Sequence, residues 1–299
     1  MPRFKKVYIE ITNNCNLACD FCPNTQRDKQ FMDAPSFLHV IEAIQPLTGH
    51  VYFHLMGEPF LHPKLKEFLE ICRQKTMKVN ITTNGTLIKK VEDVLLNAPA
   101  LRKVGFSLHS VGGSSEGSSE GINDYIDDIV EFIKKVNGTR IIELRLWNLV
   151  DEVESKCETK NERDSEIAIN HLIMGRLERR LGISLAGQHE SAKILPNVYL
   201  SFANKFDWPD LSKTTENETA FCYGLRDQFG VLVDGTVVPC CVDNEGQISL
   251  GNIFEHSIED ILSSERAQRI FEGFSNRTPF EELCKKCDFV KGAKRIRKS

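Results

Sequence analysis

The sequence predicts an α/β protein built from parallel strands, arranged as a βα barrel or as an open sheet. Over the first two hundred of the 299 residues, short apolar runs alternate with segments of helical periodicity. The connections between the apolar runs are long enough to hold a helix, which parallel strands require between them. The composition is that of a folded chain, since 41% of the residues are hydrophobic and 27% are charged.

Each expected element follows from its apolar pattern. In residues 63–73, Leu65, Phe68, Leu69 and Cys72 recur at spacings of three and four, which is the spacing of one helix face. Residues 7–11 form a short apolar run of strand length instead. On these grounds we expect strands at 7–11, 51–55, 78–82, 103–108, 140–147 and 197–202, and helices at 36–44, 63–73, 87–96, 122–136 and 165–181, the last closed by Gly182.

Charge and hydropathy limit the classes of partner. The chain has 38 Lys and Arg against 42 Asp and Glu, a net charge of −4 with no broad basic field, so we expect no nucleic-acid partner. No window approaches 18 uninterrupted apolar residues, and only a brief apolar run follows Lys5 and Lys6. We therefore expect neither a membrane span nor a secretory signal, but a cytoplasmic protein.

Two polar segments interrupt the alternation. Residues 112–121 are almost wholly Gly, Ser and Glu, so we expect a surface loop there, either a tolerated insertion or a lid ordered by substrate. Residues 210–219 are polar and rich in Thr and Glu. We take the second segment as a domain boundary, which divides the chain into residues 1–209 and residues 210–299.

The ten cysteines are clustered, which is unusual for thiols that serve as small core residues. A disulfide framework is improbable in a reducing cytoplasm, so clustered thiols indicate metal or redox chemistry. Cys72 fits a helical core stripe, and Cys157 lies in a charged segment where we expect no role. The remaining thiols predict one metal site near each end of the chain: Cys15, Cys19 and Cys22 form one group, and Cys222, Cys240, Cys241, Cys284 and Cys287 form the other.

The first group directly follows the first expected strand. Three thiolates separated by three and two residues can surround one small metal centre from a single loop. A structural zinc ion needs four ligands, and the next Cys or His is His39. Three thiolates suit a [4Fe–4S] cluster with one iron left for an outside ligand, so spacing favours the cluster over a zinc site completed from elsewhere.

This spacing, with Phe21 before the last cysteine, resembles the signature of the radical S-adenosylmethionine (SAM) superfamily. The resemblance covers roughly residues 5–205 and implies a partial six-stranded βα barrel with a SAM-binding [4Fe–4S] cluster on Cys15, Cys19 and Cys22. It also implies that Phe21 and further residues at the strand ends bind SAM. These are Gly57 and Glu58 near the methionine amino group, Thr83 and Asn84 after the third strand, Ser107 near the ribose and Arg145 near the methionine carboxylate.

The chemistry of these residue types agrees with that implication. A ligand that carries an amine and a carboxylate can chelate the open iron. Glu58 offers a negative partner for the ammonium group, and Arg145 offers a planar fork for the carboxylate. Gly57 allows the backbone to approach closely. Taken singly, Glu58-Pro59 can also begin a helical turn, and Arg145 can be a solvated strand charge.

The second cysteine group predicts a four-thiolate site. Residues 231–233 and 237–238 read as a hairpin with an Asp234-Gly235 turn, which brings Cys222 towards Cys240. With the Cys284-Lys285-Lys286-Cys287 knuckle, four thiolates can close around zinc or around a cluster. Because neighbouring strand residues face opposite sides, Cys240 and Cys241 are not both expected to bind one centre. We take Cys241 as a packing or substrate-side thiol.

The hairpin spacing, the following Gly251-Asn252-Ile253 and the terminal knuckle resemble the SPASM/Twitch extension of radical SAM enzymes. The SPASM form holds two auxiliary clusters and needs about seven cysteines. Four or five are present here, so the shorter Twitch form fits better. The resemblance implies one auxiliary [4Fe–4S] cluster on Cys222, Cys240, Cys284 and Cys287. We expect a helix at 257–271 and a frayed basic tail at 291–299.

Together, the resemblances imply an enzyme that cleaves SAM reductively to methionine and a 5′-deoxyadenosyl radical, which abstracts a hydrogen atom from the substrate. The auxiliary cluster is expected to accept an electron, and a flavodoxin or ferredoxin to supply one. The first expectation for the substrate is a peptide that is cross-linked, epimerised or oxidised. No peptide-recognition domain is evident ahead of the first strand, which keeps dehydrogenation of a small molecule such as an amino sugar open.

Two functions of a different class also agree with the cysteine pattern. One is a zinc-binding interaction module, and the other is an iron–sulfur electron carrier without catalysis. No Tyr, Cys or Lys stands out in the sequence as a base or a second hydrogen donor, so no catalytic residue is predicted.

Overall fold

The computed structural model describes residues 4–111, 119–147, 160–188, 190–203, 205–214 and 217–289. They form two compact units. Unit 1 takes its described residues from 1–15, 23–79 and 206–299, and unit 2 takes them from 16–22 and 80–205. The chain passes from unit 1 into unit 2 within strand β3 (Lys78–Thr83). The predicted loop 112–121 for the most part, Cys157 and the tail 291–299 lie outside the described residues.

Unit 1 is organised around β1 (Lys6–Ile9), which lies between two parallel neighbours. One neighbour is β2 (His50–Phe53), and the other is β8 (Gln228–Val231), which comes from the C-terminal part of the chain. Strand β9 (Val237–Val238) pairs antiparallel with β8, so the order is β2-β1-β8-β9. The predicted hairpin is present, with Gly235 at φ +87° in its turn.

Two helices cover one side of β2. They are α1 (Ala34–Ile44) and α2 (Leu65–Gln74). Phe37 of α1 stacks on Phe68 of α2 with ring centroids 4.0 Å apart, and it meets Phe53 of β2 edge-on. The side chain of Asp33 caps α1 by accepting the backbone N–H of Ser36 at 2.8 Å. Apolar burial against β2 therefore fixes the layer that the helical periodicity predicted.

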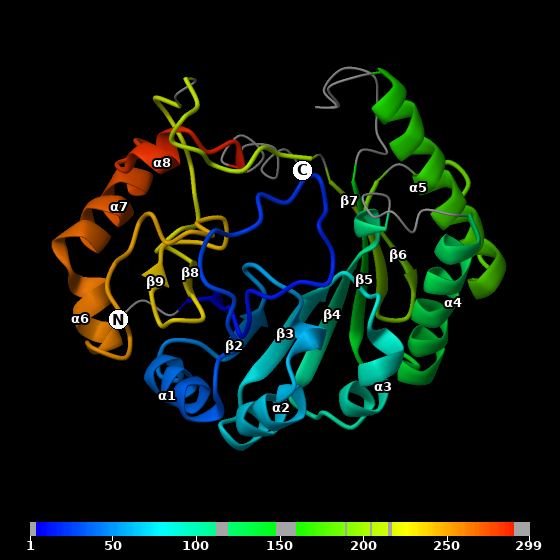
Figure 1. Cartoon of the computed structure of the whole chain (residues 1–299), viewed down its shortest axis with the longest axis horizontal. Helices are drawn as coiled ribbons and strands as arrows, with labels where there is room; N and C mark the ends of the chain where they lie inside the picture. Colours follow the sequence, from blue (N-terminus) through cyan, green and yellow to red (C-terminus); the bar gives the residue numbers. More distant parts are fainter. Residues whose placement is uncertain are drawn as a thin grey trace. The chain divides into compact units, whose positions relative to one another are not determined.

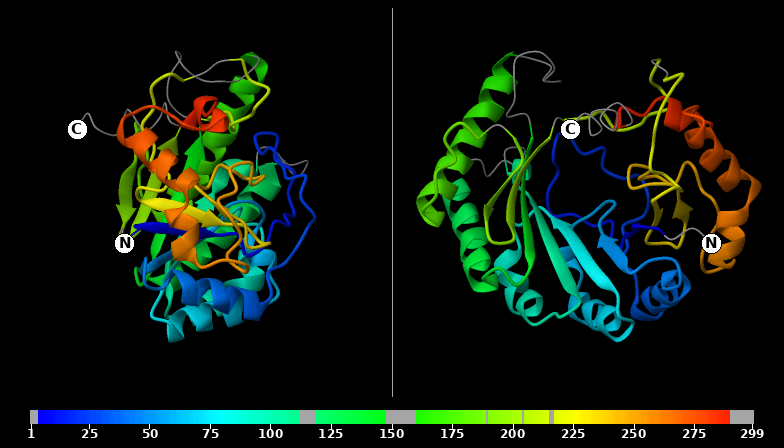
Figure 2. Two further views of the ribbon diagram at one scale, coloured as in Figure 1. Left: turned by 90° about the vertical axis from the view of Figure 1, so that its left-hand side faces the viewer. Right: turned by 180° about the vertical axis from the view of Figure 1, so that it is seen from behind.

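The C-terminal part of unit 1 holds three short helices, α6 (Ile258–Ser263), α7 (Glu265–Ser275) and α8 (Glu282–Lys285). Helices α6 and α7 follow one another along the β8–β9 hairpin (Figures 1 and 2). The prediction of one helix over 257–271 is wrong, because Ser264 takes an extended ψ of 150° and caps α7. The Ser263-Ser264-Glu265 run favours a helix start over a continuous helix.

Unit 2 continues the strand–helix alternation. Its parallel strands are the end of β3, β4 (Leu101–Ser107), β5 (Ile141–Trp147) and β7 (Val198–Ala203). Helices α3 (Ile88–Leu96), α4 (Ser119–Val136) and α5 (Lys160–Leu181) connect them (Figure 1). An antiparallel edge strand, β6 (Ala192–Leu195), was not predicted, since its short run of mixed polarity has no strand signature.

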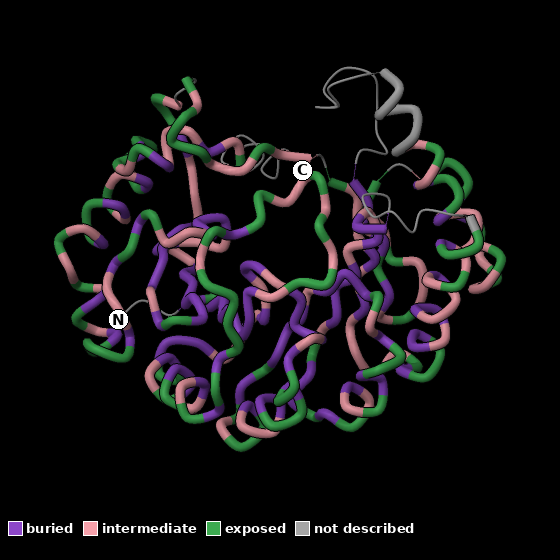
Figure 3. The backbone as a smooth tube through the Cα atoms, viewed as in Figure 1, coloured by how far each residue is buried: buried purple, intermediate pink, exposed green. Residues whose placement is uncertain are grey.

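The strands of unit 2 have one apolar face and one polar face. In β5, Ile142, Leu144 and Leu146 are fully buried, whereas Glu143 and Arg145 between them are half-buried. Figure 3 shows the buried residues running along these strands. The α/β class with parallel strands is therefore confirmed, and the polar face carries the candidate site residues. Among the described residues, no helix has both the length and the apolar character needed to cross a bilayer.

Candidate functional site

The loop of residues 16–22, which carries two of the three N-terminal cysteines, is anchored to the end of β3. Asn16 donates from Nδ2 to Thr86 Oγ1 at 2.9 Å and accepts at Oδ1 from Asn84 Nδ2 at 3.0 Å. Asn84 Oδ1 in turn accepts from the Thr86 backbone N–H and hydroxyl, at 3.0 and 2.8 Å. These bonds give Asn84 a structural task, which is to hold the cysteine loop on the carboxyl end of β3.

Within the loop, Cys19 and Cys22 are half-buried. The Cys22 backbone N–H donates to the Cys19 carbonyl at 3.0 Å, which closes a turn that curls the chain between the two thiols. The Cys19 thiol lies 3.9 Å from the carbonyl oxygen of Ser110, just after β4. Cys15 is exposed and ends the preceding segment, which belongs to unit 1.

Three aromatic rings pack beside this loop. His109 stacks on Trp147 with centroids 3.9 Å apart and an interplanar angle of 11°, and Phe21 meets both rings edge-on at 5.1 and 4.7 Å. His109 Nδ1 lies 3.3 Å from the carbonyl oxygen of Arg145. Because a carbonyl oxygen only accepts, we place the proton on Nδ1, which leaves Nε2 as an acceptor.

This histidine is held neutral. Burial and the positive charge of Arg145 together lower the pKa of His109 to about 3, against the opposing effect of the hydrogen bond to the backbone. Rings of Phe21, His109 and Trp147 therefore form an uncharged aromatic platform at the carboxyl ends of β4 and β5. Aromatic faces of this kind suit a flat heteroaromatic ring.

Ser107 and Arg145 lie side by side at the same edge of the sheet. They are register partners in the parallel pair β4–β5, and Arg145 is also the partner of Ser201 on β7. Both side chains are half-buried, and they alternate with the fully buried Phe106 and Leu144. The structure thus brings these two predicted SAM contacts onto one polar face.

Thr83 has a different environment. Its side chain is almost fully buried, and its hydroxyl accepts the backbone N–H of Gly85 at 2.9 Å. Gly85 has φ +81°, and Tyr125 donates to the Asn84 carbonyl at 2.7 Å. Thr83 therefore shapes the turn that presents Asn84 to the cysteine loop.

In unit 1, Gly57 approaches the backbone that leads into Cys15. Its φ is +77°, and an added Cβ would lie 2.8 Å from the Asn14 carbonyl oxygen, 2.9 Å from the Asn13 Cα and nearer still to the Thr12 carbonyl oxygen. The next residue, Glu58, donates its backbone N–H to Asn14 at 2.7 Å. Only glycine fits this conformation and this contact together.

The Glu58 carboxylate is buried, with 1% exposure, and Oε1 accepts the backbone N–H of Phe60 at 2.9 Å. It therefore caps the short helix η1 (Pro59–Leu61). A carboxylate oxygen is also the kind of acceptor that pairs with an ammonium group.

The four predicted auxiliary cysteines line one pocket of unit 1. Apolar side chains such as Val242, Ile248, Phe274 and Leu283 complete much of its wall. Burial, together with charge on the nearby Cys287 and Cys241, raises the pKa of Cys222 to about 12, against the opposing effect of backbone hydrogen bonds. Burial also raises the pKa of Cys240 and Cys284 well above the ordinary value, again with contributions from neighbouring thiols.

This donor set fits a thiolate-ligated cluster. Thiolates are the usual ligands of iron–sulfur clusters, and a cationic centre removes the penalty of burying four of them together. The knuckle is also held in place, because Arg266 of α7 binds both oxygens of Glu281, the N-cap residue of α8, at 2.7 and 2.8 Å. In the part of the chain that the structure describes, no three Cys, His, Asp or Glu side chains lie within reach of a single ion.

Cys241 lies at the border of two packed groups. It contacts the buried group of Tyr8, Leu55, Leu232 and Val238 and also the group around Cys287, and it lines the pocket. Burial and the neighbouring Cys241 thiol raise the pKa of Tyr8. The fifth thiol is thus adjacent to the pocket of the other four, and its exclusion from the ligand set stays a prediction.

Comparison with known families resolves the class. Residues 9–143 match the radical SAM superfamily, and residues 222–288 match SPASM, an iron–sulfur cluster-binding domain. The chain belongs to the radical SAM superfamily. The two matches imply [4Fe–4S] clusters and SAM as cofactors, as the family resemblances implied.

Relatives in this superfamily act in different settings. The antilisterial bacteriocin subtilosin biosynthesis protein AlbA of Bacillus subtilis is 25% identical over 94% of this chain. The chain spans 64% of the length of AlbA. The S-adenosyl-L-methionine-dependent 2-deoxy-scyllo-inosamine dehydrogenase of Niallia circulans is 22% identical over 96% of this chain and 94% of its own length.

A solved structure shows the same fold. SuiB of Streptococcus suis, bound to its precursor peptide SuiA, aligns with a TM-score of 0.58 and 16% identity over 99% of this chain and 74% of its own. At this identity the likeness speaks for the fold alone. The fold is the partial, TIM-like barrel of radical SAM proteins with a SPASM extension, as the resemblance to SPASM/Twitch enzymes implied, and the preference for the one-cluster Twitch form stays a prediction.

Sequence reasoning missed His109 and Trp147 in unit 2, and it missed the buried ion pair of Glu10 with Arg27 in unit 1. His109 and Trp147 were detectable in principle, because they lie at the carboxyl ends of strands, where βα folds build their sites. Glu10 was visible as a charge within an apolar strand, but its partner Arg27 has no such signal.

Proposed function

We propose that this protein is a radical SAM enzyme that removes a hydrogen atom from a peptide substrate and then oxidises the substrate radical. The observation that carries the proposal is the presence of two cysteine groups of different design in one chain. One is a three-thiol loop, and the other is a four-thiol pocket. Three ligands leave a position for SAM, whereas four ligands close a cluster to all roles except electron transfer or contact with the substrate.

When bound, the SAM cluster would supply the electron for reductive cleavage of SAM to methionine and a 5′-deoxyadenosyl radical. Cys15, Cys19 and Cys22 would hold that cluster, and Asn84 keeps their loop on β3 through Asn16. Glu58 would accept the ammonium group of the methionine moiety, and Arg145 would bind its carboxylate in a charge-assisted pair.

The platform of Phe21, His109 and Trp147 would support the adenine ring, and Ser107 would contact the ribose. The second electron, left on the substrate after hydrogen abstraction, would pass to a cluster on Cys222, Cys240, Cys284 and Cys287. A flavodoxin or ferredoxin would supply the first electron. We place the enzyme in the cytoplasm, acting without a nucleic acid or membrane partner.

Peptide modification is favoured by the similarity, over 94% of this chain, to AlbA, a protein of bacteriocin biosynthesis. One observation favours a second candidate, the dehydrogenation of a small molecule. The inosamine dehydrogenase matches this chain over nearly the full length of both proteins. In both cases the substrate loses one hydrogen atom and one further electron with a proton.

Anaerobic purification tests the proposal. We expect a brown protein with about eight irons per chain, the sum of two four-iron clusters. With reductant, it should convert SAM to methionine and 5′-deoxyadenosine. Stoichiometric zinc without iron would reject the enzyme in favour of a zinc module, and iron without SAM cleavage would leave an electron carrier.

Cysteine variants divide the two roles. We expect Cys19→Ala to abolish SAM cleavage. Cys284→Ala should retain SAM cleavage but stop substrate turnover, because it removes an auxiliary ligand and leaves the SAM loop intact. If both variants cleaved SAM like the parent, this division of roles would be wrong.

A further inference from the structure

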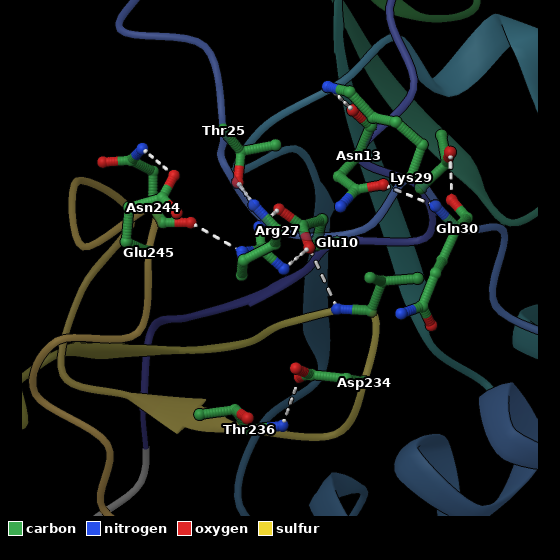
Figure 4. A network of polar contacts seen from close by, with 12 residues as sticks. Glu10, Asn13, Thr25, Arg27, Lys29, Gln30, Asp234, Thr236, Asn244 and Glu245 are labelled. Carbon is green, nitrogen blue, oxygen red and sulfur yellow. Dashed lines mark hydrogen bonds and ion pairs between the residues drawn. The ribbon is translucent and has the colours of Figure 1, made fainter.

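A buried ion pair in unit 1 joins Arg27, in the loop that follows Cys22, to Glu10, which follows β1. Arg27 donates from Nη1 and Nη2 to the two carboxylate oxygens of Glu10, at 2.8 and 2.6 Å (Figure 4). The side chain of Glu10 is fully buried and that of Arg27 is 15% exposed. Glu10 Oε2 also accepts the backbone N–H of Val233, which follows β8, at 3.0 Å. This fork is the most directional ion pair a protein side chain can make.

Further hydrogen bonds join this loop to residues 243–248, here called the auxiliary segment. Arg27 Nε donates to the carbonyl oxygen of Asn244 at 3.0 Å. The backbone N–H of Gln26 faces the Glu245 carboxylate at 3.2 Å, and Asn244 Nδ2 donates to the Asn24 carbonyl at 3.3 Å. Figure 4 shows Arg27 between Glu10 and the segment of Asn244 and Glu245.

Both segments begin next to cluster ligands. Residues 24–27 follow Cys22 by two to five positions, and Asn244 and Glu245 follow Cys240 by four and five. The residue before Asn244, Asp243, lines the auxiliary pocket and accepts the backbone N–H groups of Gln247 and Ile248 at 2.9 and 2.8 Å. The hydrogen bonds of Arg27 and Gln26 therefore end beside the wall of that pocket.

Stability alone does not account for this arrangement. Removing two charges from water costs about as much as their attraction returns, so a buried ion pair contributes mainly a defined geometry. Glu10 lies between the fully buried Ile9 and Ile11 in the chain, where an apolar side chain would serve the core as well. The pair instead fixes the position of residues 24–27 relative to the auxiliary segment.

We infer that Arg27 is a positioning residue that couples the auxiliary site to the loop leaving the SAM-cluster cysteines. Filling the auxiliary site orders residues 243–248, and Arg27 transmits that order to residues 24–30. The inference rests on the proposed function, because it needs a cluster on the four auxiliary thiols. Allosteric couplings of this kind typically correspond to 5- to 150-fold effects.

Hydrogen exchange of residues 24–30 tests this coupling in the anaerobic holoprotein. The first comparison is between the parent and the Cys284→Ser/Cys287→Ser variant, which lacks the two thiols of the auxiliary knuckle. We expect exchange in this segment to be about tenfold faster in the variant, a value within the usual range of coupling. The second comparison repeats the pair in the Arg27→Gln background, where we expect a difference of less than about twofold.

A matched control comes from the same loop. Lys29 donates to the Asn13 carbonyl at 3.0 Å, a contact that does not involve the auxiliary segment. Lys29→Gln removes the same charge as Arg27→Gln but should keep the tenfold difference. Arg27→Lys keeps the charge and loses the fork, so it should lose the coupling, and it replaces Arg27→Gln if that variant does not fold.

The outcomes separate the two claims. Equal exchange of residues 24–30 with and without the auxiliary knuckle, in a parent that holds about eight irons, would overturn the coupling and leave the proposed function standing. An undiminished difference in both Arg27 variants would also overturn it. A parent with about four irons would overturn the auxiliary cluster and the coupling together.

Discussion

Replacing Gly57 by alanine tests how the segment before Cys15 is positioned. Gly57 has φ +77°, where an L-residue costs about 1–2 kcal/mol. The added Cβ would also overlap the backbone of Thr12, Asn13 and Asn14, none of which can rotate away as a side chain end would. Overpacking of this kind costs about 1–3 kcal/mol. We therefore expect Gly57→Ala to lose about 2–5 kcal/mol of unfolding free energy.

A matched glycine separates the two contributions. Gly182 has a similar φ of +66°, but an added Cβ there meets no atom of the described structure within 4 Å. Gly182→Ala should therefore lose about 1–2 kcal/mol, the cost of the backbone conformation alone. Anaerobic urea unfolding measures both free energies, and iron analysis shows whether the SAM cluster is retained.

The expected losses differ because the overlap at Gly57 pushes on the three residues before Cys15. We therefore also expect Gly57→Ala to bind SAM more weakly and to lose iron from the N-terminal site. If Gly57→Ala were as stable as Gly182→Ala and held iron and SAM like the parent, the close contact between Gly57 and the cysteine segment would be wrong.

Three further predictions follow from single contacts. Asn84→Ala removes a hydrogen bond to Asn16 worth about 1 kcal/mol, so SAM affinity measured by equilibrium binding should fall about fivefold, whereas an unchanged affinity would refute the anchoring role. Arg27→Gln leaves the buried Glu10 charge without its ion pair and should lose about 3–5 kcal/mol in urea unfolding; a loss below 1 kcal/mol would mean that the pair is not buried as described. The pKa of His109 is lowered from 6.5 to about 3, so between these two pH values the folded state binds fewer protons than the unfolded state. The free energy of unfolding should therefore fall as pH falls from 6.5 towards 3, by at most about 1.4 kcal/mol per pH unit. His109→Phe should flatten this slope, and an identical slope in both proteins would contradict the assignment.

The local sequence pattern was sufficient to predict most of the strands and helices. The strand expected at 140–147 and β5 differ by one residue, because alternating burial leaves a clear apolar face. The helix expected at 257–271 breaks at Ser264, where two adjacent serines compete with the helix by capping a new one. The pairing of β8 with β1 had no sequence signal, since 222 residues separate Tyr8 from its register partner Gly230 and no local pattern indicates the contact.

In the candidate site, too, local features were predictable from the sequence and long-range contacts were not. Cysteine spacing predicted both metal groups, because a loop or knuckle must place its ligands within a few residues. The partners that orient these loops come from elsewhere in the chain. Asn84 reaches Asn16 across 68 residues, and Arg27 reaches the Asn244 carbonyl across 217. Contacts of this separation depend on the packing of the strands, which no short motif encodes.

Electron paramagnetic resonance of the reduced protein, with and without SAM, tests the central claim most directly. We predict a signal from a [4Fe–4S] cluster that shifts when SAM is added and is absent in Cys19→Ala, which shows that SAM ligates the iron left open by three thiolates. If SAM changed no cluster signal, or if the protein bound zinc and no iron, the account would be contradicted.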